Sequence, residues 1–92
     1  MLCGAETFKK MTKSVMELAD RNCGGKLMMA HEGGYSEVHV PFCGHAVLEE
    51  MSGSLIEVVD PLKARIDGQQ PSKDFNNFVL TKICEIEQQL FR

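Results

Sequence analysis

The sequence predicts a small α/β fold, with three helices around one or two short strands, in a single domain over residues 1–92. Residues 27–31 form an uncharged run between the glycine pairs at 24–25 and 33–34, which is typical of a strand buried on both faces. Residues 5–22 and 73–90 repeat apolar side chains at intervals of three and four, as amphipathic helices do. A glycine turn followed by Pro41 then predicts a strand–turn–helix unit, because proline suits the first turn of a helix.

The first helix is expected over residues 5–22. Its apolar side chains fall on one stripe, which predicts a packing helix: Phe8, Met11, Val15, Leu18 and Ala19. The lysines lie on other faces and are expected to be solvated. Gly24 and Gly25 follow, and a glycine is well suited to the left-handed position just past a helix end.

The predicted strand at residues 26–31 leads into a glycine turn. Met28 and Met29 are adjacent, so they point to opposite faces of a strand and fill a core rather than share a copper ion. The turn delivers Tyr35 and Ser36 to the carboxyl end of the strand. In open α/β sheets, ligands bind at that end.

The second half of the chain contains two further predicted helices. One runs over residues 41–51, and the other over residues 73–90 with Ser72 as its N-cap and Asp74 in its first turn. Between them, residues 55–59 are apolar and β-branched, which fits a short strand or an extended connector. Residues 63–71 are expected to be the least ordered part of the chain, with a loop at 68–71.

Several short motifs together resemble a known family. They are Glu-Gly-Gly-Tyr-Ser at 32–36, Val-Pro-Phe-Cys-Gly at 40–44, Ala-Val-Leu-Glu at 46–49, Ser-Gly at 52–53 and Asp-Pro at 60–61. This pattern resembles the C-terminal part of the histone deacetylase / acetylpolyamine amidohydrolase family, and is most similar to its bacterial class II-like members. The resemblance covers roughly residues 1–62, and the last helix more loosely. It implies a C-terminal fragment of the arginase/deacetylase-type parallel-sheet fold.

The resemblance also implies a role for the turn at residues 32–36. In the family, the tyrosine of this motif hydrogen-bonds the acetyl carbonyl, and by position that residue is Tyr35, here a vestigial catalytic residue. Glu32, Gly33, Gly34 and Ser36 would shape the turn. The family's zinc ligands and adjacent histidine pair lie upstream of the matched region, and this chain has no Asp-x-His and no adjacent histidines. The chain is therefore expected not to be an enzyme, to hold no cofactor, and to keep Tyr35 as an exposed or interface aromatic.

Five residues near the turn raise the possibility of a metal site, and they are His31, Glu32, His39, Cys43 and His45. Their spacing fits neither H-E-x-x-H nor a zinc-finger pattern, so no metal site is expected.

Composition excludes several classes of partner. A net charge of −3 disfavours nucleic-acid binding, and no apolar run approaches the ~18 residues of a membrane span. The N-terminus has no signal-peptide profile, so a cytoplasmic location is expected. The four cysteines are spread out without a C-x-x-C, as free thiols in a reducing compartment would be.

A strand without neighbours leaves backbone groups unpaired, which predicts a homodimer. Antiparallel pairing of residues 27–31 across a twofold axis would cap the strand edge, and exchange of the C-terminal helix is the alternative. Three functions then compete. The favoured one is a non-catalytic, self-associating interaction module. In the second, this chain supplies Tyr35 to a zinc amidohydrolase whose other residues belong to another deacetylase-like chain. In the third, the turn binds a small molecule or a metal.

Overall fold

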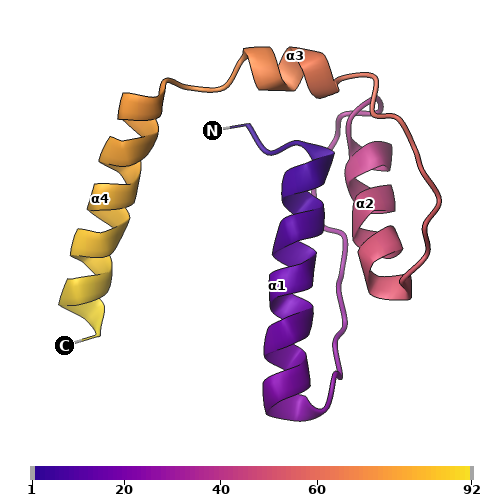
Figure 1. The fold of residues 1–92 in the computed structure, drawn as a ribbon, viewed down its shortest axis with the longest axis horizontal. Helices are drawn as coiled ribbons and strands as arrows, with labels where there is room; N and C mark the ends of the chain where they lie inside the picture. Colours follow the sequence, from indigo (N-terminus) through magenta and orange to yellow (C-terminus); the bar gives the residue numbers. More distant parts are fainter. Residues whose placement is uncertain (1, 92) are drawn as a thin grey trace.

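The computed structural model describes residues 2–91, and every element within that range is a helix. The helices are α1 (Ala5–Cys23), α2 (Val40–Ser52), α3 (Lys63–Gly68) and α4 (Lys73–Leu90). Helices α1 and α2 lie side by side and pack on each other, whereas α4 stands apart at the far end of α3 (Figure 1). The fold is therefore one helix pair with an extended C-terminal arm.

The ends of α1 and α2 follow local signals in the sequence. Gly24 caps α1 in the left-handed conformation (φ 63°), and its N–H donates a hydrogen bond to the Ala19 carbonyl. Pro41 lies in the first turn of α2, and Gly53 caps the other end at φ 69°. Both helices are confirmed to within two residues of their predicted bounds.

Helix α4 begins where the sequence predicts. The Ser72 hydroxyl accepts a hydrogen bond from the Phe75 N–H at 3.2 Å, and Asp74 lies in the first turn. A side-chain acceptor at the N-cap satisfies a backbone donor that has no partner within the helix. The predicted N-cap and the predicted helix over residues 73–90 are both confirmed.

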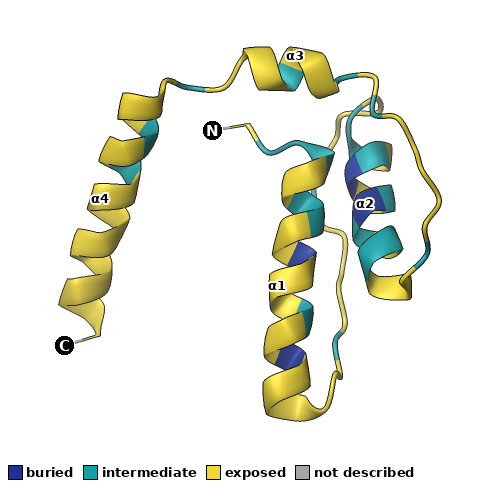
Figure 2. Ribbon diagram, viewed as in Figure 1, coloured by how far each residue is buried: buried dark blue, intermediate teal, exposed yellow. Residues whose placement is uncertain are grey.

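The buried core is small and lies between α1 and α2. Among residues 2–91 the buried side chains are Thr12, Ala19, Cys43 and Ala46. Thr12 satisfies its hydroxyl by donating to the Phe8 carbonyl at 2.8 Å. Figure 2 places the buried positions along the facing sides of the two helices and leaves α4 largely exposed. The interface thus buries small side chains, while most large apolar ones remain in contact with solvent.

The predicted α/β fold is wrong, and so is the parallel sheet that the resemblance implied. Residues 26–31 form part of an extended connection between α1 and α2, and no strand occurs in the described part of the chain. Met28 is 88% exposed. A strand exists only where a neighbouring backbone accepts and donates its hydrogen bonds, and nothing else in residues 2–91 supplies that neighbour. The apolar run indicates a tendency to be buried, but it does not supply the sheet.

Two smaller expectations about the second half are also corrected. Residues 55–59 form an extended connector and not a strand, with Leu55 91% exposed. Residues 63–68, expected to lie in the least ordered part of the chain, form the short helix α3. The Lys63 ammonium and the Asp67 carboxylate, one helical turn apart, form an ion pair at 2.6 Å. The predicted loop begins only after Gly68.

None of the helices within residues 2–91 is both long enough and apolar enough to cross a membrane.

Candidate functional site

The turn that carries the predicted site residues is fastened to the start of α2. The Ser36 hydroxyl accepts a hydrogen bond from the His39 N–H at 3.3 Å, and the Ser36 carbonyl accepts one from the Val40 N–H at 3.0 Å. Gly33 and Gly34 lie at φ 68° and 72°, in the left-handed region that glycine adopts without a steric penalty. The Gly-Gly pair therefore sets the direction in which the chain enters the helix.

Tyr35 lies between this glycine pair and Ser36 and is 94% exposed. Gly34 is exposed, but a Cβ there would lie 3.1 Å from Val40 Cγ2 and 3.3 Å from His31 Nε2. Glu32 is exposed on the same turn. The predicted site residues thus lie in one irregular segment that leads into α2, and the tyrosine ring is in solvent.

His39 joins three segments of the chain next to this turn. Its Nε2 lies 3.1 Å from the Cys3 carbonyl oxygen and 3.2 Å from Cys43 Sγ. A carbonyl oxygen only accepts hydrogen bonds, so Nε2 carries the proton and donates it toward Cys3. The other ring nitrogen, Nδ1, is buried without a hydrogen-bond partner in the described part of the chain. This contact ties the N-terminal segment to α2, and sequence analysis did not anticipate it.

Cys43 is a structural thiol in this arrangement. Burial raises the pKa of its thiol above the ordinary value of 9.0, and the nearby Asp60 carboxylate adds to that rise. A thiolate is the reactive form of cysteine, and a raised pKa suppresses it at neutral pH. Cys43 therefore packs as a small apolar residue and does not have the properties of a nucleophile.

The five residues considered for a metal site do not converge. His39 and Cys43 are in contact, but within residues 2–91 no three His, Cys, Asp or Glu side chains lie where they could hold one ion. The residues present do not fit the zinc site that the resemblance implies, and no step of a zinc reaction is derived from this chain. His45 lies elsewhere, on the wall of a cleft.

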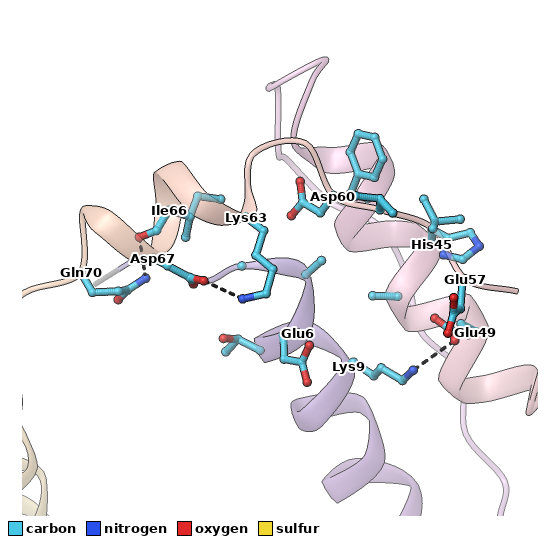
Figure 3. A pocket seen from close by; sticks show the side chains of 17 residues that line it. Glu6, Lys9, His45, Glu49, Glu57, Asp60, Lys63, Ile66, Asp67 and Gln70 are labelled. Atoms are coloured by element: carbon cyan, nitrogen blue, oxygen red, sulfur yellow. Dashed lines mark hydrogen bonds and ion pairs between the residues drawn. The ribbon is translucent and has the colours of Figure 1, made fainter. Parts of the chain in front are cut away.

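That cleft has a volume of about 440 Å³ and lies between the start of α1, helix α2, the connector at 54–62 and α3 (Figure 3). Its apolar lining includes Phe42, Ala46, Val58 and Ile66. Carboxylates surround this lining, at Glu6, Glu49, Glu57, Asp60 and Asp67. Tyr35 is not among the lining residues, so the cleft gives no support to a small-molecule site at the tyrosine turn.

The two lysines of the cleft are already paired with carboxylates. Lys9 Nζ lies 3.1 Å from Glu49 Oε1 and links α1 to α2. The Glu49 carboxylate, hydrogen-bonded to that ammonium, raises the pKa of Lys9, and Asp67 raises the pKa of Lys63 in the same way. Raised pKa values keep both lysines charged, so neither is available as a neutral base or nucleophile at neutral pH.

This cleft was not predicted, because residues 55–59 were expected to be a short strand or an extended connector and residues 63–71 the least ordered part of the chain. One signal was available: Lys63 and Asp67 are four residues apart, which is the spacing of an ion pair on a helix. No signal in the sequence pairs Lys9 with Glu49, because they are 40 residues apart and meet only once α1 packs on α2.

Comparison with known proteins identifies the relatives of the chain. No family model matches it. A histone deacetylase-like amidohydrolase of Pseudomonas aeruginosa, however, is 46% identical over 85 residues. The chain is similar to a histone deacetylase-like amidohydrolase. The resemblance predicted from the motifs at 32–36 and 40–44 is thereby confirmed.

The aligned residues cover 92% of this chain but 22% of the Pseudomonas histone deacetylase-like amidohydrolase. The chain thus spans about a fifth of the length of this curated relative. The activity that the relative's name describes belongs to that whole protein.

Proposed function

We propose that this chain is a non-catalytic interaction module of the histone deacetylase-like type, which is stable when another polypeptide covers its apolar surface. One observation supports this above all: no large side chain among residues 2–91 is fully buried, and most large apolar ones are exposed. Folding costs about 1–2 kcal/mol of backbone entropy per residue, which apolar burial normally offsets. The buried alanines and cysteine of the α1–α2 interface are too few to supply that burial.

The absence of catalysis in the isolated chain is part of the proposal. Within residues 2–91 no metal-ligand cluster exists, Cys43 is held as a thiol, and the lysines of the cleft are ion-paired. These features argue against a metal-bound Lewis acid, against Cys43 as a nucleophile and against the cleft lysines as bases. We also propose that the chain has no cofactor of its own, does not bind nucleic acid, and works in the cytoplasm as a single domain. The net charge of −3 and the dispersed cysteines are consistent with this.

Light scattering and denaturation of the purified chain test the proposal. We expect a mass above that of the 10.3 kDa monomer, and an unfolding midpoint that rises with protein concentration, because association stabilises the folded state by mass action. An acetyl-lysine peptide assay with added zinc should give no turnover. A monomer that unfolds cooperatively at a concentration-independent midpoint would refute the interaction module, and turnover would refute its non-catalytic character.

A second candidate function is favoured by the position of Tyr35. Its 94% exposure on a turn shaped by two left-handed glycines leaves the phenol free to enter a site formed by another chain. There it would donate a hydrogen bond to a substrate carbonyl, as positioned donors do at acyl-transfer sites. The test mixes this chain with the Pseudomonas relative truncated to lack the aligned segment. Turnover only in the mixture, lost in Tyr35→Phe, would establish this role, and an inactive mixture would exclude it.

A further inference from the structure

Helix α4 presents a continuous apolar face that nothing in residues 2–91 covers. Its members recur at helical spacing and are between 50% and 71% exposed: Phe75, Phe78, Ile83, Ile86 and Leu90. An amphipathic helix with such a face is stable only when that face is buried against another surface. We call these five residues the α4 stripe.

Helix α1 carries a second uncovered face. Thr12 and Ala19 point into the α2 interface, whereas Met11, Val15 and Leu18 are 41–55% exposed. Since successive residues of an α-helix turn by about 100°, these three lie roughly a quarter of a turn from the α2-facing side. We call them the α1 stripe. A third helix can pack on the α1 stripe without displacing α2.

The α1 stripe matches the C-terminal part of the α4 stripe in spacing, and the two helices are of similar length. Helices of 19 and 18 residues are about 28 and 27 Å long. The α1 stripe read backwards runs from 18 to 15 to 11, in steps of three and four. The α4 stripe read forwards runs from 83 to 86 to 90, in the same steps. Antiparallel helices with equal spacings bring their apolar rows into register.

From these observations we infer that α4 of one chain packs antiparallel on the α1 stripe of a second copy, and that the exchange is reciprocal. The inference rests on the proposed function and names its partner and surface. Within one chain, α3 and its flanking connections hold α4 away from the helix pair (Figure 1). A second copy related by a twofold axis meets both uncovered stripes at once and closes the assembly.

The surface available is enough for a stable dimer. The eight side chains of the two stripes are each about half exposed. The six side chains that this register pairs are Met11, Val15, Leu18, Ile83, Ile86 and Leu90. With roughly 200 Å² for a fully exposed large side chain, they provide about 600 Å² at each contact. Two symmetry-related contacts bury about 1,200 Å², which is the lower end of the range for specific interfaces. One contact alone falls below that range, so the area supports the reciprocal arrangement.

The test uses one charged substitution in each stripe, under reducing conditions that keep the exposed Cys23 and Cys84 from forming disulfides. Light scattering of the full chain should give about twice 10.3 kDa. Ile86→Glu and Val15→Lys should each raise the dimer dissociation constant at least tenfold, because each disrupts both contacts. Asn77→Glu, on the opposite side of α4, is the matched control and should remain dimeric.

The decisive experiment mixes the Ile86→Glu variant with the Val15→Lys variant and measures the mass again. The heterodimer has one unaltered contact and one in which the introduced carboxylate faces the introduced ammonium, so dimer mass should return on mixing. This recovery also shows that the single variants are folded. A dimer unaffected by Ile86→Glu, or no recovery on mixing, overturns the inference but leaves the proposed function standing. A wild-type chain that is monomeric at every concentration also overturns the inference. Whether that monomer unfolds cooperatively then tests the proposed function separately.

Discussion

Two glycines of helix α2 allow the same substitution to be tested in opposite directions. Gly44 lies inside α2 and Gly53 caps its end at φ 69°. A Cβ built at either position meets no atom within 4 Å, so side-chain crowding plays no part at either site. Only the backbone conformation distinguishes them. Gly44→Ala should therefore stabilise the protein, and Gly53→Ala should destabilise it.

The expected magnitudes follow from backbone preferences. Alanine is favoured over glycine inside a helix by about 0.5–1 kcal/mol, because the unfolded glycine chain has more entropy to lose. At Gly53 the left-handed conformation costs a residue with a Cβ roughly 1–2 kcal/mol, which outweighs the entropy gained. For a chain of this size, 1 kcal/mol shifts the melting temperature by about 4–8 °C.

Circular dichroism at 222 nm, measured during heating at one fixed protein concentration, compares the two variants. Fixing the concentration matters because an associating chain melts at a concentration-dependent temperature. We expect the two melting temperatures to move apart by about 5 °C or more, on opposite sides of the wild type. If both variants shifted in the same direction, the α2 boundary at Ser52, or the free space around Gly44, would be wrong.

Three further predictions concern the N-cap, the thiol and the tyrosine. Ser72→Ala removes the acceptor for the Phe75 N–H and should cost helix α4 about 1 kcal/mol, seen as lower helicity, whereas Ser72→Asp should retain it. Because burial raises the pKa of Cys43, the folded state favours the protonated thiol. The stability that this thiol contributes is complete below pH 9.0 and declines as pH rises through the folded-state pKa. The melting temperature should therefore fall as pH rises above 9.0, and less steeply in Cys43→Ala. Tyr35 is 94% exposed, so Tyr35→Phe should change the free energy of unfolding by less than about 0.5 kcal/mol and leave peptide turnover unchanged.

Helices were predictable from this sequence because their signals are local. Pro41, Ser72 and the glycines at 24 and 53 act on backbone groups within a few residues, and the structure places a helix boundary at each of them. Hydrogen bonds inside a helix close over four residues, so no distant partner is needed. Helix α3 escaped prediction because it is only six residues long and is followed at once by a loop signal at 68–71.

The strand at residues 26–31 could not be predicted correctly from the same kind of information. Its apolar run indicates a tendency to be buried, but a strand also needs a neighbouring backbone, and the sequence does not say whether this chain provides one. The turn at 32–36 was located because glycine pairs are local signals. Its contact with α2 through Gly34 and Ser36 was not, because it depends on tertiary packing.

The wrongly predicted strand at residues 26–31 and the exposed α1 and α4 stripes have one physical cause. The apolar pattern of a sequence reflects all the surfaces that its side chains cover, including surfaces contributed by other polypeptide. Here that pattern calls for more burial than residues 2–91 contain, while the relative that shares 46% identity is several times longer than the aligned segment. Met28, Val15 and Ile86 are among the apolar side chains that residues 2–91 leave exposed. Because the α1 and α4 stripes complement each other, a second copy of the same chain can cover them.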